Sequence, residues 1–284
     1  MRVLVIGSSG QLGSDIVKAM RRGGHEVIGL THQQIEVSDR LSCRVIVDLK
    51  PDVVVNTAAF HKTDACEDEP LRAFQVNSLG ARYVAEACLE AGASVCYIST
   101  DYVFDGSKGE PYTELDDPNP INTYGVSKLA GECFTKMNPR HYIFRVASLF
   151  GAAGSSGKGG NFIESVVGKA MRGEELTVVD DIYMSPTYTV DAAEAIKSVL
   201  ESGLPYGVYH VVNEGFCSWH SFAQEAIRLL ELSVEVKRVK AAEMKFRARR
   251  PMFSALRSVK LPFRMRGWRE ALAAYLVEKG YLRA

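Results

Sequence analysis

Short apolar runs alternate along this chain with longer segments whose apolar residues recur at helical spacing. Five such runs lie at residues 3–6, 27–30, 53–56, 95–99 and 142–147. They are continuous, as in strands buried on both faces, and a helix is predicted over residues 73–91. Strands separated by helices predict a parallel sheet between two helical layers. We therefore expect an α/β fold of the doubly wound, Rossmann type, with its ligand at the carboxyl ends of the strands.

The pattern changes after residue 150, where a glycine-rich segment begins. The elements predicted beyond it are helices at 161–172, 190–201 and 218–230 and a strand at 207–212. We predict a dinucleotide-binding core at residues 1–150. Residues 151–284 are expected to form mostly a smaller, interleaved substrate-binding lobe, with residues from about 176 to 212 returning to the core.

Composition narrows the possible partners. The chain has 284 residues, with 34 lysines and arginines against 34 aspartates and glutamates, so the formal net charge is zero. This balance argues against a uniformly basic nucleic-acid-binding protein. No segment approaches the roughly 20 apolar residues of a membrane span. Six cysteines form no C-x-x-C pair, which favours reduced thiols and a cytoplasmic location.

Gly7, Gly10 and Gly13 form a G-x-x-G-x-x-G motif between the first predicted strand and its following helix. Glycines allow the backbone to approach a pyrophosphate, and a helix N-terminus offers free N–H groups and positive potential. The motif therefore predicts dinucleotide binding. The alternative is a tight turn that requires glycine and binds nothing.

The end of the second predicted strand bears on the choice of cofactor. A carboxylate there usually binds the adenosine ribose 2′-hydroxyl of NAD. Here the sequence is Leu30-Thr31-His32-Gln33, with neither a carboxylate nor an arginine. We expect NADPH as the preferred cofactor, and NADH stays the alternative.

Tyr124 and Lys128 are four residues apart and would share one face of a helix. A nearby ammonium favours phenolate, so we expect the lysine to lower the pKa of the tyrosine and make it a usable acid. Thr100 ends the fourth predicted strand, where it can reach the same substrate oxygen. A second pair with this spacing, Tyr275 and Lys279, is interpreted as part of a solvated helix face.

The chain resembles the extended short-chain dehydrogenase/reductases in a series of motifs that occur in the same order. These motifs are GSSGQLG, PDVVVNTAA, VNSLGA, YISTDYVFDG, PYTELDDPNPINTYGVSKLAGE, GGNF, VVDDIYMSPTY and ARRP. STDYVFDG together with YGVSKLAGE is similar, more narrowly, to the dTDP-4-dehydrorhamnose reductase family, over nearly the whole chain. The resemblance implies reduction of the C4 ketone of dTDP-4-dehydro-L-rhamnose to dTDP-L-rhamnose, with NADPH or NADH as cofactor.

The resemblance also implies roles for individual residues. The implied catalytic residues are Thr100, Tyr124 and Lys128, of which the last two also contact the cofactor. The other implied cofactor-binding residues are Gly7, Gly10, Gln11, Leu12, Gly13, Glu36, Val37, Thr57, Ala58 and Ala59. The expected substrate-binding residues are Thr100, Asp101, Ser148, Asn161 and Arg250.

Two positions qualify what the resemblance implies. Ser148 stands where the family commonly has a tryptophan that packs on the sugar, which leaves the exact sugar open. Some members bind magnesium between subunits through acidic residues, and Asp15 occupies one such position. A single carboxylate on an N-terminal helix more often interacts with the helix dipole. We therefore expect no essential metal.

Positive charge is concentrated near the C-terminus. Residues 237–269 contain 12 lysines and arginines and one acid, Glu243, so this segment carries a net charge of +11. A solvated basic face is one interpretation. The other is attraction of an anionic nucleotide sugar, with Arg250 as a bidentate clamp on its diphosphate. The segment lacks the dense aromatic residues that stack nucleic-acid bases, so no nucleic-acid partner is expected.

Several alternatives to this function stay open. They are a reductase or epimerase for another nucleotide 4-keto sugar, a nucleotide-sugar 4,6-dehydratase, and a non-catalytic NADP-binding regulatory subunit. The dehydratase is disfavoured because Thr100-Asp101 is followed by Tyr102 rather than by glutamate. We expect a nucleotide sugar as the small-molecule partner, no membrane partner, and a monomer or homodimer.

Overall fold

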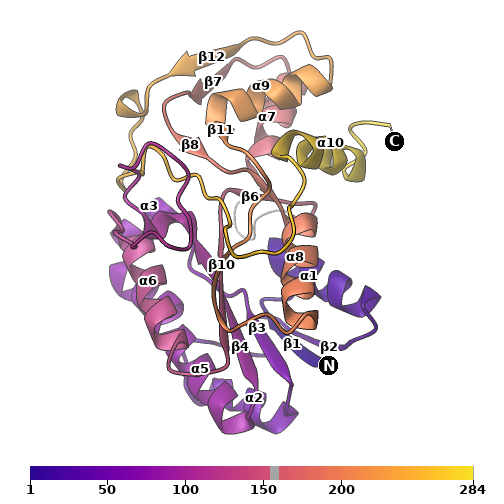
Figure 1. Cartoon of the computed structure of the whole chain (residues 1–284). Coiled ribbons are helices and arrows are strands. Elements are labelled where there is room, and N and C mark those ends of the chain that lie inside the picture. Colours follow the sequence, from indigo (N-terminus) through magenta and orange to yellow (C-terminus); the bar gives the residue numbers. More distant parts are fainter. Residues whose placement is uncertain (154–159, 284) are drawn as a thin grey trace.

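The computed structural model describes residues 1–153 and 160–283. Its centre is a six-stranded sheet in the order β10-β5-β4-β3-β1-β2, in which every strand pair is parallel (Figure 1). The strands are β1 (Arg2–Ile6), β2 (Glu26–Leu30), β3 (Val53–Asn56), β4 (Ser94–Thr100), β5 (His141–Val146) and β10 (Gly207–His210). The predicted doubly wound α/β fold is confirmed. The glycine-rich segment that begins after residue 150 lies partly outside the described residues.

Successive residues of β1 face opposite layers, which explains its unbroken apolar sequence. Val3 and Val5 pack in one cluster with α1 (Gln11–Arg22) and α8 (Thr189–Glu201). Leu4 and Ile6 pack in a second cluster on the other face of the sheet. The helices near that second face are α2 (Val45–Leu49), α5 (Gly80–Ala91) and α6 (Thr123–Thr135). Because both faces of the sheet are covered, the inner positions of β1 are all apolar.

The helix predicted over residues 73–91 is interrupted. It consists of α4 (Pro70–Phe74), a π-helix at Gln75–Leu79 and α5. Asn77 in the π-helix is fully buried, and its amide bonds the backbone of Phe60 and the hydroxyl of Ser127. π-Helical turns are frequent at functional sites, and this one ties α6 to the loop after β3.

The chain after β5 builds a second, smaller layer and then returns to the sheet. Its helices are α7 (Phe162–Met171), α9 (Trp219–Leu229) and α10 (Trp268–Glu278). Its strand pairs are β6 (Leu149–Phe150) with β9 (Thr187–Tyr188), β7 (Leu176–Val179) with β12 (Val236–Val239), and β8 (Tyr183–Met184) with β11 (Cys217–Ser218). The remaining short helices are α3 (Thr63–Asp68), η1 (Ser42–Arg44), η3 (Asp101–Val103) and η4 (Ala241–Glu243). The chain was predicted to return to the core from about residue 176. α8 and β10 do return to the main sheet, whereas β7 pairs with β12 and β8 with β11 in the smaller layer.

The interpretation of Tyr275 as part of a solvated face is wrong. Its side chain is fully buried in a cluster that includes Phe150 and Trp268. Its hydroxyl accepts a hydrogen bond from Asn161 Nδ2 at 2.9 Å. The flanking apolar residues of α10 place this face of the helix in the lobe core, whereas the side chain of Lys279 is 25% exposed.

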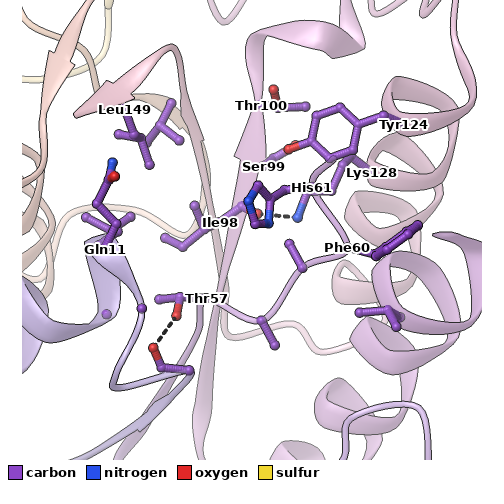
Figure 2. A pocket seen from close by; sticks show the side chains of 18 of the residues that line it. Gln11, Thr57, Phe60, His61, Ile98, Ser99, Thr100, Tyr124, Lys128 and Leu149 are labelled. Atoms are coloured by element: carbon purple, nitrogen blue, oxygen red, sulfur yellow. Dashed lines mark hydrogen bonds between the residues drawn. The ribbon is translucent and has the colours of Figure 1, made fainter. Parts of the chain in front are cut away.

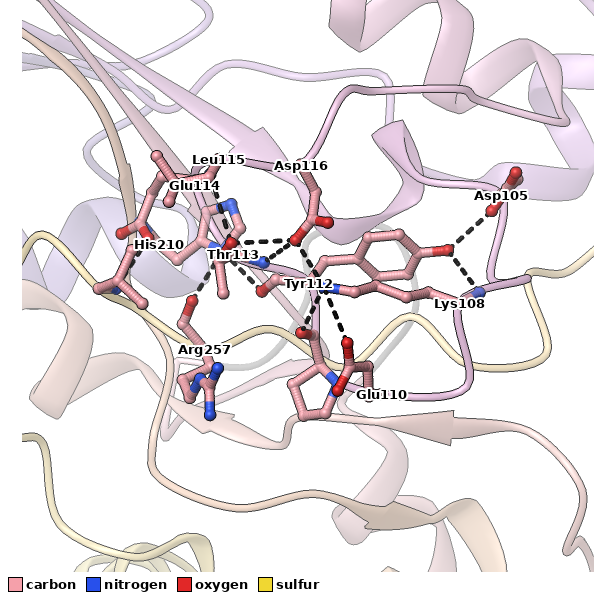
Figure 3. Close-up of polar contacts among 12 residues, drawn as sticks. Asp105, Lys108, Glu110, Tyr112, Thr113, Glu114, Leu115, Asp116, His210 and Arg257 are labelled. Atoms are coloured by element: carbon pink, nitrogen blue, oxygen red, sulfur yellow. Dashed lines mark hydrogen bonds and ion pairs between the residues drawn. The ribbon is translucent and has the colours of Figure 1, made fainter.

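A polar cluster fastens the C-terminal segment to the end of the main sheet (Figure 3). The buried His210 at the end of β10 holds its Nδ1 3.1 Å from the carbonyl of Tyr112 and 3.2 Å from that of Arg257. Its backbone N–H donates to Glu114. Burial lowers the pKa of His210 to about 4, so it is neutral near pH 7 and can donate Nδ1–H to these carbonyls.

Two general features concern the whole described chain. None of the described helices is both long and apolar enough to span a membrane. The six cysteines, all within the described residues, form no disulfide.

Candidate active site

One large cavity of about 1190 Å³ opens at the carboxyl ends of the central strands (Figure 2). The expected site residues that line it are Gly7, Gly10, Gln11, Leu12, Gly13, Glu36, Val37, Thr57, Ala58, Ala59, Thr100, Asp101, Tyr124, Lys128, Ser148 and Asn161. The structure therefore brings together residues that are far apart in sequence. Arg250 is the expected site residue that does not line this cavity.

The glycine motif makes the turn from β1 into α1. Gly7 has φ of +78°, and a Cβ there would lie 2.5 Å from Thr57 Oγ1. A Cβ on Gly13 would lie 2.2 Å from the carbonyl oxygen of Gly7, so α1 packs directly on the turn. Gly10 precedes α1 without a side-chain cap, which leaves helix N–H groups free for a ligand. The turn fits a pyrophosphate, because an anion there meets free N–H groups and the positive end of the helix dipole.

The carboxylate of Glu36 also lines this cavity. Glu36 accepts hydrogen bonds from the backbone and hydroxyl of Ser38, and its Oε2 lies 3.3 Å from His32 Nδ1. Burial alone would raise the pKa of Glu36, but the bonds from Ser38 and the nearby His32 lower it. The sequence has no acid at the end of the second strand. The fold nevertheless brings an ionised carboxylate into the same cavity, because Glu36 lies only six residues after the end of β2.

Tyr124 is brought to Thr100 by close packing of α6 against the turn after β4. Asn122 caps α6 by accepting a hydrogen bond from the N–H of Gly125. A Cβ on Gly125 would lie 2.1 Å from the carbonyl oxygen of Tyr102, so glycine is required for this approach. Figure 2 shows the Thr100 and Tyr124 side chains adjacent at the cavity wall.

The expected effect of Lys128 on Tyr124 is wrong for this structure. Burial raises the pKa of Tyr124, and a hydrogen bond with Thr100 only partly opposes that rise. Lys128 instead donates from Nζ to the carbonyl of Ile98 at 2.6 Å and lies 4.0 Å from the ring centroid of Tyr97. Burial lowers the pKa of Lys128 itself to about 7. The two side chains share a helix face, but desolvation outweighs their mutual electrostatics.

The two remaining substrate candidates that line the cavity differ in character. Ser148 has φ of +43°, a left-handed conformation that is rare for residues other than glycine. Asn161 uses its side chain for structure: Oδ1 accepts from the N–H of Glu164, and Nδ2 donates to Gly151 and Tyr275. Its amide is therefore engaged in capping α7.

Arg250 lies behind the cavity rather than in it. Its Nη2 donates to Asp64 Oδ1 at 2.9 Å, and only 14% of its side chain is exposed. Its Nη1 is buried and has no hydrogen-bond partner. The geometry therefore does not support a clamp on a diphosphate in this conformation.

Six of the twelve basic residues of segment 237–269 pair with acids from elsewhere in the described chain. These pairs are Lys237–Glu175, Arg238–Asp180, Arg247–Asp68, Arg250–Asp64, Arg264–Glu214 and Arg266–Asp191. The positive charge of this segment is thus partly offset within the fold. This favours the structural interpretation over long-range attraction of an anionic substrate.

Sequence reasoning missed several residues that line the cavity. They include His32, Ile35, Ser38, Phe60, Arg72, Gln75, Val76, Leu149, Phe162, Ser165, Trp219 and Phe222. Most are apolar, and a buried wall residue has the same sequence signature as a core residue. The position of Phe60 and of its neighbour His61 directly after the third strand was the one available signal.

Among the described residues, no group of three or more histidines, cysteines or acids is placed to hold a metal ion. Asp15 is buried, accepting hydrogen bonds from Lys18 and from Thr189 Oγ1. Its carboxylate thus joins α1 to α8.

Comparison with known proteins places this site in a family. A family model described as the RmlD substrate binding domain matches residues 1–280. A dTDP-4-dehydrorhamnose reductase of Aggregatibacter actinomycetemcomitans is 33% identical over 274 residues, covering 92% of each chain. The chain belongs to the dTDP-4-dehydrorhamnose reductase family. This confirms the resemblance predicted from the motifs.

Further proteins are similar to this chain in sequence or in fold. The spore coat polysaccharide biosynthesis protein SpsK of Bacillus subtilis is 38% identical, covering 98% of both chains. The crystal structure of the Bacillus anthracis dTDP-4-dehydrorhamnose reductase in complex with NADP has a TM-score of 0.92 at 34% identity, covering 98% of this chain and 99% of that one. A UDP-glucose 4-epimerase of Thermotoga maritima has a TM-score of 0.84 at 20% identity, covering 99% and 98%, which shows the shared fold alone.

Proposed function

We propose that this protein is a dTDP-4-dehydrorhamnose reductase, which reduces the C4 ketone of dTDP-4-dehydro-L-rhamnose to dTDP-L-rhamnose. The observation that carries the proposal is the meeting of Thr100, Tyr124 and Lys128 at the wall of one cavity with the glycine turn. The membership of the chain in this family supports the same substrate class.

NADPH or NADH, when bound, supplies the hydride that reduces the ketone carbon. We assign the proton to the hydroxyl of Tyr124, which donates it to the developing C4 alkoxide. The raised pKa of Tyr124 keeps the phenol protonated near neutral pH, so the acid is present in its active form. Thr100 lies beside Tyr124 at the cavity wall; its hydroxyl proton is donated to Asp101, so its assigned role is to position the Tyr124 hydroxyl. Lys128 is placed to bind the nicotinamide ribose, since it lines the cavity beside Tyr124.

The pyrophosphate of the cofactor is assigned to the glycine turn and to Gln11, which lines the cavity and can donate from its amide nitrogen. Thr57, Ala58 and Ala59 line the cavity between this turn and the catalytic residues. NADPH stays the preferred cofactor in this proposal, supported by the NADP complex of the B. anthracis relative. Glu36 in the adenosine region is the feature that favours NADH.

A second candidate function rests on Ser148. A serine at this position offers the sugar a small polar surface in place of a large apolar one, so a reductase or epimerase for another nucleotide 4-keto sugar is the alternative. A non-catalytic NADP-binding subunit would bind the cofactor without turnover. A cytoplasmic location, a monomeric or homodimeric state and the division into core and lobe stay predictions.

The assay is consumption of NADPH and of NADH, followed at 340 nm, with a panel of nucleotide 4-keto sugars. We expect dTDP-4-dehydro-L-rhamnose to be turned over with the highest kcat/KM. Tyr124→Phe should lower kcat by a factor of about 10² to 10⁴, as expected for loss of a general acid, while the Kd for NADPH stays within twofold.

Tyr275→Phe is the matched control, because Tyr275 is also a buried tyrosine four residues before a lysine. It should leave kcat unchanged. Faster turnover of a different keto sugar would move the assignment to the second candidate. NADPH binding without oxidation on any keto sugar would identify the regulatory alternative, and equal losses in both tyrosine variants would refute the catalytic assignment.

A further inference from the structure

Asp101 is a buried carboxylate directly behind the catalytic threonine. Its side chain is in the turn that follows β4, and the residue is 3% exposed. Oδ1 accepts a hydrogen bond from Thr100 Oγ1 at 2.9 Å, and Oδ2 accepts one from Ser254 Oγ at 2.5 Å. A residue near the C-terminus thus reaches the catalytic centre through one intermediate side chain.

Ser254 is held rigidly by the smaller lobe. It is 1% exposed, and its backbone N–H donates to the carbonyl of Tyr183 at 2.9 Å. Two residues on, Leu256 exchanges two hydrogen bonds with the hydroxyl of Ser185, which donates to its carbonyl and accepts from its N–H. The position of the Ser254 hydroxyl is therefore set by lobe backbone, and Ser254 itself does not line the cavity.

The chemistry of the bond fixes its direction. An ionised carboxylate has no proton and can only accept, so Thr100 must donate its single hydroxyl proton to Asp101. This fixes the threonine side chain beside Tyr124. Hydrogen bonds to the charged form of a carboxyl favour that form, and burial has the opposite effect. Burial raises the pKa of Asp101 to about 6, and the hydroxyls of Ser254 and Thr100 hold it from rising further.

We propose that Ser254 is a positioning residue for the reduction: its hydroxyl keeps Asp101 ionised and in place, and Asp101 in turn holds the Thr100 hydroxyl beside Tyr124. This rests on the proposed function, because Thr100 and Tyr124 are the catalytic groups assigned there. The position of the catalytic side chains would then depend on how the segment around Ser254 docks, although that segment follows them by more than 100 residues in the sequence.

Other groups around Asp101 bear on any pH dependence. Tyr124 from α6 and Tyr102 from the same turn face it, and burial raises the pKa of both, that of Tyr102 to about 12. Arg250 from the C-terminal segment and Asp64 from α3 face Tyr102. Two further titratable groups, Lys128 and His61, line the cavity, and burial lowers the pKa of Lys128 to about 7.

The test compares the wild type with Ser254→Ala, Ser254→Thr and Ser185→Ala. Ser185 is the matched control because it is a buried serine bonded to the same segment without contact to Asp101. For each protein we would measure kcat against pH from 4.5 to 9 with a dTDP-4-keto sugar and NADPH. The carboxyl pKa of Asp101 would be followed in parallel by ¹³C NMR.

Ser254→Ala should move both the acidic limb of kcat and the Asp101 titration up by about one pH unit, because a hydrogen bond to the ionised form is lost. Ser254→Thr retains the hydroxyl and should restore the wild-type limb. Ser185→Ala should leave it in place, and the Kd for NADPH should be the same in all four proteins. A limb that depends on Lys128 or His61 would not move with Ser254.

The inference is overturned if Ser254→Ala leaves the Asp101 titration where it is in the wild type, or if Ser185→Ala shifts the limb equally. It is also overturned if the titration moves while the kcat profile does not. A wild-type protein that oxidises no NADPH with any keto sugar refutes the proposed function instead. In that case the NMR titration still decides whether Ser254 controls the ionisation of Asp101.

Discussion

The ion pair of Glu132 and Arg145 is the most deeply buried in the described chain, and its removal gives a sharp test of how the site is supported. Glu132 on α6 accepts from Arg145 Nε at 2.9 Å, from Arg145 Nη2 at 2.8 Å and from Ser99 Oγ at 2.6 Å. Their side chains are 0% and 4% exposed. The pair therefore ties α6 to β4 and β5 directly beneath Thr100.

Glu132→Ala should lower the free energy of unfolding by about 3–5 kcal/mol, because it leaves the guanidinium of Arg145 buried without its counter-charge. The Phe104 ring, 5.1 Å from the guanidinium carbon, is a weak substitute. The double variant Glu132→Leu with Arg145→Met removes both charges. We therefore expect its loss of unfolding free energy to be smaller than the summed losses of Glu132→Leu alone and Arg145→Met alone.

The assay is urea denaturation followed by tryptophan fluorescence, with a double-mutant cycle across the pair. Glu90→Ala is a surface control, since its pair with Arg44 is exposed on both sides, and it should change stability by less than about 1 kcal/mol. A loss below about 1 kcal/mol for Glu132→Ala would refute the argument. So would a double variant that loses the full sum.

Two further predictions concern the cavity itself. Gly13→Ala should raise the Kd for NADPH at least tenfold in a fluorescence titration, because its Cβ would lie 2.2 Å from the Gly7 carbonyl oxygen. Gly267→Ala is the control: a Cβ there meets nothing within 4 Å, so the Kd for NADPH should not change. The pKa of Lys128 is about 7 in the folded protein against a reference of 10.5, so between these values the unfolded chain binds more protons. The stability of the wild type relative to Lys128→Met should therefore rise from pH 7 to pH 9 in urea denaturation, and a constant or falling difference would contradict the lowered pKa.

The layer structure was predictable because it depends on local patterns. A strand covered on both faces must be continuously apolar, so β1 to β5 were found within one residue of their ends. The glycine turn and the pair of Tyr124 and Lys128 were visible for the same reason, since each lies on one local element.

What escaped the sequence depends on contacts between distant residues. The partner of Arg250 is Asp64, and nothing near either residue indicates that they meet. The pKa of Tyr124 was expected to fall because Lys128 is a near neighbour on the helix, but its direction is set by burial, which only the assembled fold determines. Tyr275 was misassigned although its apolar neighbours in α10 could have indicated a buried face.

The place of β10 at the edge of the main sheet has a consequence for how the chain folds during synthesis. β10 is made after the whole of α7 and α8, yet it pairs with β5, and α8 covers the apolar face of α1. Until residue 210 has left the ribosome, β5 presents an open strand edge, and such edges pair readily with other chains. A nascent or truncated chain that stops near residue 150 therefore lacks one sheet edge and half of one helical layer. The sheet that carries the glycine turn is therefore completed only by sequence that follows α7.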